Sequence, residues 1–250
     1  MNWISLIGLA MAALGAVSYL LMIFVFGGFT YRTWIFHGTI AAGVVVATVG
    51  WLAGEDPVYA LATLVIATVW VVLTWKELGI AGSDRLRIRP GSRLPDFALV
   101  TTDGTTVTNQ DVVAEGPALL VFYRGWWCPT HKAQLDEIVE AHERLSRAGF
   151  SVWAASVDLP EESQPIQDRV GDAVTVLCGV DDALLSELGI RDDRGAPWYD
   201  RLLFGAKDQE IAMPTAIVVD GAGTVRFASR STRLDGRAAP EEILAALGPG

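Results

Sequence analysis

Three long, uncharged apolar stretches near the N-terminus constrain this chain of 250 residues more than any other feature. They cover residues 3–27, 34–53 and 57–75, and each is close to the roughly 20 residues that a helix needs to cross about 30 Å of hydrocarbon. Residues 1–83 hold two basic and three acidic side chains, and the other 17 basic and 26 acidic ones all follow. A single buried helix could resemble one such stretch, but three in succession predict membrane-spanning helices.

Tryptophan residues lie close to the ends of the three stretches, where indole rings favour the headgroup layer of a bilayer. They are Trp3, Trp34, Trp51 and Trp75. The first stretch differs from a cleaved signal peptide, because residues 1–5 carry no Lys or Arg and the apolar run exceeds the usual length of about 7–15 residues. We therefore expect residues 1–76 to form a transmembrane domain of three helices.

The basic residues that flank the stretches predict an orientation. Arg32 lies between the first two stretches, and Lys76 and four arginines follow the third, whereas residues 54–56 carry no basic side chain. Residues 77–93 are expected to form a juxtamembrane linker whose arginines face anionic headgroups. Because basic flanks favour the cytoplasmic side, we predict an integral protein of the cell membrane with its N-terminus outside and its C-terminal domain in the cytoplasm.

Small residues recur at helical spacing within the stretches, in three pairs. The pairs are Gly8 and Ala12, Gly38 and Ala42, and Gly43 and Ala47. Such residues let helices approach closely, either within this chain or against another integral membrane protein or complex. His37 is ionisable, but it lies near the Arg32 end of its stretch, so we expect it at the membrane interface.

The charge and cysteine content exclude several other classes of protein. A net charge of −10 and a pI of about 4.7 argue against nucleic acid as a partner, because phosphate contacts need clustered Lys and Arg. Two cysteines cannot form a disulfide framework, and the chain has no CxxC pair for a structural zinc site. It also lacks a GxGxxG motif, a P-loop and a calcium loop. We expect neither a metal nor a cofactor.

From residue 94 on, short apolar runs alternate with turns and amphipathic stretches, which predicts an α/β domain over residues 94–250, with helices on both faces of a mixed sheet. Strands are predicted at 95–100, 105–108, 118–123, 150–156, 174–178, 215–219 and 224–228. Helices are predicted at 129–147, 161–170, 182–188 and 239–247. Residues 190–212 are expected to form the longest irregular loop. The acid-rich segment 158–168 is expected to be the first turn and solvated face of a helix.

The segment between the third predicted strand and the next helix holds the residues best suited to chemistry. The chain turns at Gly125, and Cys128 falls at the beginning of the helix, with Pro129 near its first position. Unpaired backbone N–H groups and the positive end of the helix dipole favour thiolate over thiol there. The pattern indicates a reactive thiol, and the alternative is an inert cysteine that behaves as a small buried hydrophobe.

Three side chains close to Cys128 in the sequence would assist a reactive thiol. Arg124 and Lys132 add positive charge, and His131, about one helical turn after the cysteine, is a candidate proton partner. Four aromatic residues would either wall a pocket near the cysteine or only pack the domain. They are Trp126, Trp127, Trp198 and Tyr199.

The segment FYRGWWCPTHKAQL, residues 122–135, resembles the active-site stretch of AhpC/TSA peroxiredoxin-like proteins of the thioredoxin superfamily. Residues 91–97 resemble the usual opening of these proteins, and residues 213–220 resemble the strand after the active site. The resemblance covers about residues 90–250. It implies a thioredoxin-like fold, fused here to a three-helix membrane anchor, and an antioxidant or oxidoreductase activity that depends on a redox-active cysteine.

The same resemblance implies roles for particular residues. Cys128 would be the catalytic cysteine, with His131 and Arg124 as further catalytic candidates. A loop facing the substrate or thiol would be formed by Trp127, Pro129, Thr130, Met213 and Pro214. In the thioredoxin superfamily, the proline that corresponds to Pro214 is cis and faces the cysteine.

The chain departs from the family pattern at several positions. His131 replaces the second cysteine of the thioredoxin motif WCxxC, so dithiol–disulfide cycling through that pair is impossible. Peroxiredoxins usually show PxxxTxxC, whereas Val121 and Gly125 occupy the Pro and Thr positions here. The family arginine that helps to hold thiolate and peroxide aligns near Pro214. The candidates to replace it are Arg124 and Arg201.

The sequence supports two hypotheses of function. The first is a membrane-anchored thiol oxidoreductase of the one-cysteine type, in which Cys128 attacks a peroxide or disulfide and an external thiol resets it. Cys178 then occupies a buried core position, although a resolving role stays open. The alternative is an accessory or assembly subunit of a membrane complex, for example a respiratory one, with a catalytically degenerate thioredoxin-like domain. The partners implied are the lipid bilayer, an external thiol reductant and another integral membrane protein.

Overall fold

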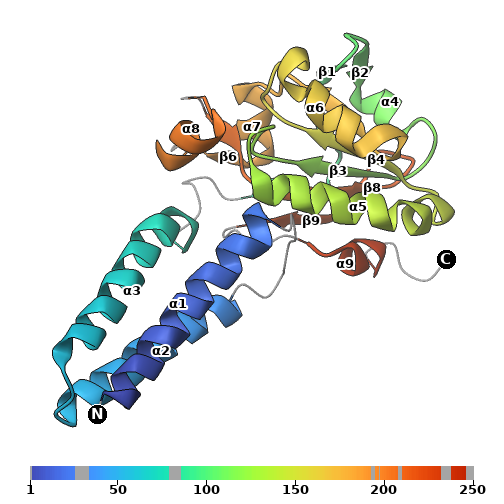
Figure 1. Cartoon of the computed structure of the whole chain (residues 1–250). Helices are drawn as coiled ribbons and strands as arrows, with labels where there is room; N and C mark the ends of the chain where they lie inside the picture. Colours follow the sequence, from blue (N-terminus) through green and yellow to red (C-terminus); the bar gives the residue numbers. More distant parts are fainter. Residues whose placement is uncertain are drawn as a thin grey trace. The chain divides into compact units, whose positions relative to one another are not determined.

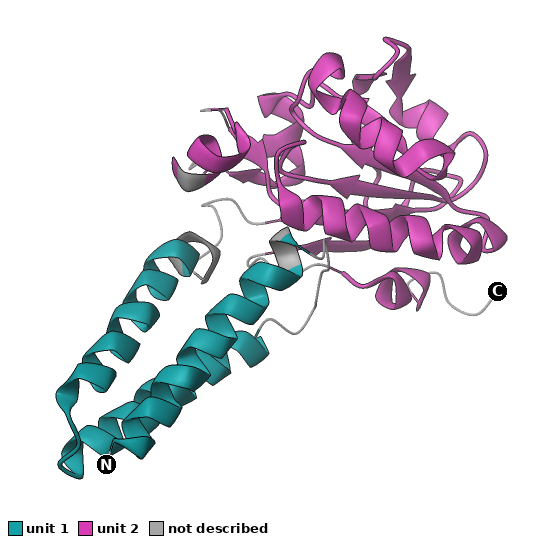
Figure 2. Cartoon of the chain, viewed as in Figure 1, with its two compact units in different colours: residues 1–79 teal, residues 80–250 magenta. Residues whose placement is uncertain are grey.

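The structure is a computed structural model that describes residues 2–25, 34–78, 86–192, 195–196, 198–207, 210–231 and 238–245. The chain divides into two compact units, residues 1–79 and 80–250 (Figure 2). The division between them falls inside the predicted linker at 77–93. Three basic residues used to predict the orientation lie outside the residues or side chains that the structure describes. They are Arg32, Lys76 and Arg85.

The first unit consists of three helices, α1 (Trp3–Phe24), α2 (Trp34–Leu52) and α3 (Pro57–Leu78) (Figure 1). By length and composition, all three are apolar enough to cross a membrane. Only 17% to 28% of the apolar window of each helix is buried inside the unit. A helix that is hydrophobic on all sides and so little covered needs apolar surroundings. These helices are therefore candidate membrane spans, as predicted.

Helices α1 and α2 approach so closely that side chains are excluded from part of their contact. A Cβ atom added at Gly8 would lie 2.6 Å from the carbonyl oxygen of Gly43, and one added at Gly43 would lie 2.8 Å from the amide nitrogen of Ala12. The predicted pairs at Gly8 and Gly43 thus pack within the chain. The pair at Gly38 does not, because a Cβ added there would meet no atom within 4 Å.

Polar side chains join the ends of the same three helices. The Glu55 carboxylate accepts hydrogen bonds from the backbone N–H groups of Ile4 (3.1 Å) and Ser5 (2.7 Å), which a helix start otherwise leaves unpaired. The Asp56 N–H donates to Oδ1 of Asn2. The beginning of α1 and the α2–α3 connection therefore lie at the same end of the unit.

His37 contributes to the contact between α2 and α3. The indole Nε1 of Trp70 donates a 2.9 Å hydrogen bond to Nδ1 of His37, and the Tyr19 ring packs edge-on against Trp70 at 5.2 Å. A polar side chain in this position is paired with a neighbouring helix, which accounts for a histidine in an otherwise apolar segment.

The second unit is built on a seven-stranded mixed sheet in the order β2-β1-β5-β4-β3-β8-β9 (Figure 1). Its strands are β1 (Ala98–Thr101), β2 (Thr106–Thr108), β3 (Ala118–Phe122), β4 (Ser151–Ala155), β5 (Thr175–Cys178), β8 (Thr215–Val219) and β9 (Val225–Arg230). The neighbours β3, β4 and β5 are parallel, and the other pairs are antiparallel. The carboxyl ends of three parallel strands therefore meet at one edge, where the loop that carries Cys128 begins.

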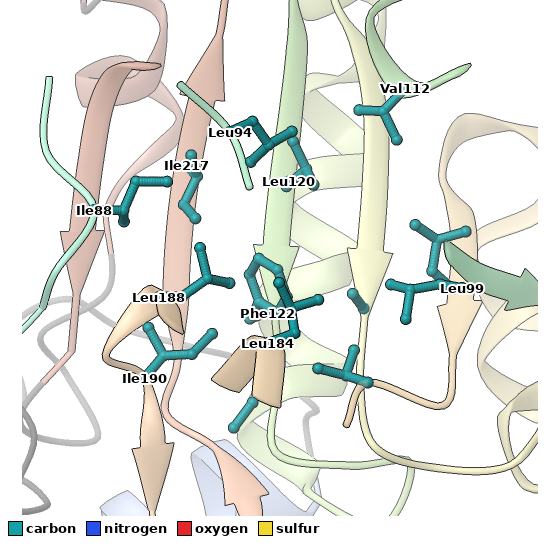
Figure 3. Close-up of a cluster of buried hydrophobic side chains, with 14 of the residues drawn as sticks. Ile88, Leu94, Leu99, Val112, Leu120, Phe122, Leu184, Leu188, Ile190 and Ile217 are labelled. Atoms are coloured by element: carbon teal, nitrogen blue, oxygen red, sulfur yellow. The ribbon is translucent and has the colours of Figure 1, made fainter. Parts of the chain in front are cut away.

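Helices lie on both faces of this sheet, as the sequence predicts. They are α4 (Asn109–Val113), α5 (Pro129–Arg147), α6 (Pro160–Val170), α7 (Asp182–Leu188), α8 (Trp198–Phe204) and α9 (Pro240–Ala245). Strand β3 is buried on both sides, because Leu119 and Val121 pack with α5 and α6, whereas Leu120 and Phe122 pack with α7. Figure 3 shows the cluster on the α7 side of the sheet, in which Leu184 lies beside Phe122. The continuous apolar run of β3 was therefore interpreted correctly.

The segment 190–212 was predicted to be an irregular loop, and this prediction is wrong for most of the part that the structure describes. It contains α8 and two short strands, β6 (Arg191–Asp192) and β7 (Ile211–Ala212), which pair with each other. Ile211 and Ala212 are fully buried, so this pair carries core side chains. The short helix α4 was also missed, since its five residues are too few to show a periodicity. A capping box between Thr108 and Asp111 begins it.

Candidate active site

Cys128 lies at the junction between β3 and α5, as the sequence predicts. It is the N-cap residue of α5, Pro129 follows in the first turn, and the Cys128 carbonyl accepts the N–H of Lys132 at 3.2 Å. The Cys128 N–H itself donates to the carbonyl of Gly125 at 3.1 Å, which closes a tight turn before the helix. The cysteine is thus held at the positive end of a 19-residue helix.

The surroundings of Cys128 are mostly apolar, and its residue surface is 4% exposed. It packs in a cluster with Trp127, Ala196, Ala206 and Ile211. Partly buried side chains that complete the cluster are Trp126, Val157 and Phe204. Four residues of the stretch that the sequence predicts to be a loop therefore supply much of the apolar contact around this cysteine; they are Ala196, Phe204, Ala206 and Ile211.

The positively charged candidates lie around the same turn. Arg124 is 7% exposed as a residue, and its guanidinium carbon lies 5.8 Å from the centre of the Trp127 ring; the Lys132 ammonium lies 5.7 Å from the centre of the Trp126 ring. Burial lowers the pKa of Lys132 and Arg169 adds to this effect, whereas the negative charge of a Cys128 thiolate acts in the opposite direction. Lys132 is therefore close enough to Cys128 to interact with its charge.

His131 and Thr130 lie in the buried first turn of α5. The residue surface of His131 is 1% exposed, and its ring is 6.1 Å from that of Tyr123 at the end of β3. Thr130 is 5% exposed. Both residues lie within three positions of Cys128 in the first turn of α5, and both are buried.

Met213 and Pro214, for which the resemblance implies a loop facing the substrate or thiol, lie directly before β8. Met213 packs in the core cluster around β3 and α7, and its N–H donates to the carbonyl of Ile190 at 2.7 Å. Pro214 accepts the N–H of Ser231 at 2.7 Å, which extends the ladder between β8 and β9. No cis peptide bond occurs among the described residues, so the implied cis proline at this position is wrong for this structure.

The aromatic candidates divide into two groups. Trp126 and Trp127 pack around Cys128, whereas Trp198 on α8 is 60% exposed, and the side chain of Tyr199 lies outside the described residues. Arg201, the second candidate to replace the family arginine, is exposed on α8. Of the two arginine candidates, Arg124 is the one in the turn that leads to Cys128.

Asp158 is part of this site, and the sequence interpretation missed it. The acid-rich segment 158–168 was expected to be the first turn and solvated face of a helix, which is confirmed for Glu161 and Asp168 on α6, but Asp158, just before the helix, is 2% exposed. Its Oδ2 accepts the N–H of Trp126 at 2.7 Å and the hydroxyl of Ser156 at 2.9 Å. Burial raises the pKa of Asp158 to about 6, although these two hydrogen bonds act in the opposite direction. Its position just after a strand parallel to β3 is the signal that could have identified it.

Cys178 occupies the core position that the sequence predicts. It is 0% exposed at the end of β5, and it packs with the α5 side of the sheet, in a cluster separate from that of Cys128. Burial raises the pKa of its thiol, and the charges of Asp158 and Glu161 add to that effect. Both cysteines are free thiols in the structure.

A mixed sheet flanked by helices, in which an interior strand leads to a cysteine at the start of a helix, defines a thioredoxin-like α/β fold. The chain belongs to the AhpC/TSA family, whose model matches residues 90–228. No curated protein matches the chain. The family and the fold together support a function of the thiol peroxidase type.

Several solved structures share this fold. Peroxidoxin BcpB from Mycobacterium tuberculosis has a TM-score of 0.53 and 18% identity over 64% of this chain and 97% of its own. A thiol peroxidase from Chromobacterium violaceum has a TM-score of 0.52 and 18% identity over 68% and 90% of the two chains. Reduced Prx3 from Vibrio vulnificus has a TM-score of 0.51 and 20% identity over 65% and 99%. At these identities the likeness shows the fold alone.

Proposed function

We propose that this protein is a membrane-anchored, thiol-dependent oxidoreductase that reduces peroxides or disulfides through Cys128. The observation that carries the proposal is the position of Cys128 as the N-cap residue of α5, at the end of the turn that follows β3, in a chain of the AhpC/TSA family. A helix start offers unpaired N–H groups and a positive dipole end, which stabilise a thiolate. Lys132 and Arg124 supply further positive charge nearby.

In the proposed reaction, the Cys128 thiolate attacks one oxygen of a peroxide. A sulfur–oxygen bond forms as the oxygen–oxygen bond breaks, and the leaving oxygen takes up a proton to become water or an alcohol. The sulfur is thereby oxidised to a sulfenic acid. An external thiol then displaces water to form a mixed disulfide, and a second thiol molecule releases Cys128 and departs as the oxidised disulfide. Cys178 takes no part, because it is fully buried in another cluster.

Arg124 and His131 have separate proposed roles in this cycle. Arg124 would stabilise the negative charge of the thiolate, and His131 would hold or transfer the proton that the leaving oxygen needs. Both are buried in the turn and first helical turn around Cys128, which supports these roles.

The second candidate function is that of an accessory or assembly subunit of a membrane complex. The 4% exposure of Cys128 favours this alternative, as do Val121, Gly125 and His131 in place of the usual family residues. In that case the second unit would be a binding module, and the apolar helices would contact another integral membrane protein.

The pH dependence of Cys128 alkylation separates the two functions. One sample of the full-length protein in detergent is treated with iodoacetamide over a range of pH, a separate unalkylated sample is treated with hydrogen peroxide, and mass spectrometry measures the modification of each cysteine in both. For an oxidoreductase, we expect a midpoint below the free thiol value of about 8.5 and rapid sulfenic acid at Cys128. A midpoint at or above that value, with no oxidation and with stoichiometric membrane partners in the purified sample, would support the accessory subunit instead.

We further propose that the three apolar helices anchor the protein in the cell membrane, with the N-terminus outside and the second unit in the cytoplasm. The basic flanks support this orientation, and a reducing compartment suits a cycle that depends on external thiol. We expect the chain to stay in the membrane fraction after an alkaline wash. A phosphatase reporter fused at Gly250, active only outside the cytoplasm, should be silent. An active reporter would reverse the orientation, and release by the wash would exclude the anchor.

A further inference from the structure

Asp158 follows strand β4, and its side chain contacts the turn that precedes Cys128. Strands β3 and β4 are parallel and adjacent, so the turn that follows β3 and the residues that follow β4 emerge at the same edge of the sheet. The carboxylate of Asp158 accepts the N–H of Trp126 at 2.7 Å, two residues before Cys128. The Ser156 hydroxyl donates to the same oxygen at 2.9 Å and so orients the carboxylate.

The other side of the turn is equally constrained. Gly125 has φ of +155°, and a Cβ added there would lie 3.2 Å from Oδ1 of Asp158 and 2.5 Å from Nε1 of Trp127. The backbone of Gly125 is therefore enclosed between the Asp158 carboxylate and the Trp127 indole. The carbonyl of the same glycine accepts the N–H of Cys128. A displacement of this turn would be transmitted directly to the cysteine.

The charged and titratable groups around Asp158 come from every element packed against it. They are Tyr123 at the end of β3, Cys178 at the end of β5, Glu162 on α6 and Lys207 after α8. Lys207 forms an ion pair with Glu162 at 2.5 Å. The Glu162 charge raises the pKa of Asp158 and the Lys207 charge lowers it. Burial also raises the pKa of Tyr123, to which the Asp158 charge contributes, so this phenol stays neutral.

We propose that Asp158 is a positioning residue for Cys128: its buried carboxylate holds the turn of residues 125–127 by accepting the Trp126 N–H, and it thereby places the sulfur for reaction. This inference deepens the proposed thiol peroxidase function and rests on it. Asp158 acts through the turn and does not itself exchange a proton or electron with the substrate. Misplacement of a reacting group by about 1 Å can cost about a hundredfold in rate, which is the scale of effect at issue.

The same carboxylate gives opposite pH dependences for stability and for positioning. The folded-state pKa of about 6 is above the usual 3.8, so the contribution of Asp158 to stability is full below about 4 and is lost as the pH rises through about 6. The ionised form accepts hydrogen bonds at both oxygens, so the hold on Trp126 strengthens over the same range. If Asp158 had only a structural role, stability and the reactivity of Cys128 would change in the same direction with pH.

The test compares three variants of the full-length protein in detergent. Asp158→Ala removes the acceptor, Asp158→Asn keeps one carbonyl oxygen for the Trp126 N–H, and Asp168→Ala removes an exposed carboxylate of α6 that bonds Gln164. Amide hydrogen exchange at Trp126 measures the hold on the turn, and exchange within β3 and α5 verifies the fold. The rate of sulfenic acid formation at Cys128 with hydrogen peroxide measures the placement of the sulfur.

We expect Asp158→Ala to speed amide exchange at Trp126 by about tenfold to a hundredfold, because a hydrogen bond to a charged group is lost. Oxidation of Cys128 should slow by a similar factor. Asp158→Asn should restore most of both effects and remove the part of the pH dependence of stability between about 4 and about 6 that comes from Asp158. Asp168→Ala should match the wild type in both measurements.

Unchanged exchange at Trp126 in Asp158→Ala would overturn the proposal. So would slow oxidation in Asp158→Ala that Asp158→Asn fails to restore while the exchange at Trp126 is restored. If the wild-type protein forms no sulfenic acid at all, the proposed function fails and this role for Asp158 fails with it. If the wild type reacts and the rates of all variants are equal, the function stands and the positioning role is wrong.

Discussion

Replacing Cys128 with serine is expected to abolish peroxide reduction. The cycle requires a thiolate that forms a bond to oxygen, and a serine hydroxyl stays protonated at neutral pH and cannot be oxidised in this way. Removal of an enzymatic nucleophile typically costs about a thousandfold or more in rate. The measurement is peroxide consumption by the full-length protein in detergent, with a small external thiol as the reductant.

The matched control for this variant is Cys178→Ala. Because Cys178 is fully buried and packs in a different cluster, its loss should leave the rate of peroxide consumption unchanged. An enzyme that stops after one turnover in Cys178→Ala would show that Cys178 resolves the sulfenic acid, and the one-cysteine cycle would be wrong. Full activity in Cys128→Ser would place the reaction elsewhere, and the proposed role of Cys128 would be wrong.

Replacing Gly125 with alanine is expected to have the second largest effect on reactivity. The added Cβ would lie 2.5 Å from Nε1 of Trp127, and the φ of +155° is one that residues with a side chain rarely adopt. The turn must shift to relieve this contact. Because the Cys128 N–H donates a hydrogen bond to the carbonyl of Gly125, the shift also displaces the cysteine. We expect Cys128 oxidation to slow by about a hundredfold and the free energy of unfolding to fall by about 1–3 kcal/mol.

The control for Gly125 is a glycine with a similar backbone requirement and free space around it. Gly149, between α5 and β4, has φ of +81°, and a Cβ added there would meet no atom within 4 Å. Gly149→Ala should therefore lose about 1 kcal/mol or more of stability through backbone strain, yet keep the wild-type oxidation rate. Equal oxidation rates in the two alanine variants would show that the turn at Gly125 does not position the cysteine.

Some parts of this structure could be predicted from residue patterns, because the patterns are local. The uncharged stretches at residues 3–27, 34–53 and 57–75 correspond to α1, α2 and α3, since length and apolarity alone are characteristic of a candidate span. The helix over 129–147 was predicted with the observed bounds, because Pro129 begins it and an amphipathic pattern continues to its end.

Other parts depended on contacts between distant segments. The exposure of Gly38, unlike Gly8 and Gly43, follows from the faces that α1 and α2 present to each other, which the spacing of small residues does not specify. The short strands β6 and β7 lie about 20 residues apart and stabilise each other only as a pair, so neither has a local pattern of its own.

The sequence by itself determined the three apolar helices, the buried central strand and the cysteine at the start of α5, since each follows from composition or periodicity within a few turns of chain. Only the tertiary structure decided that Ala196, Ala206 and Ile211 pack with Cys128 and that Asp158 is buried against the turn before it. The physical reason is that burial of a polar group depends on which strands become neighbours. The pairing of β3 with β4 joins residues about 30 positions apart, and no local pattern contains that information.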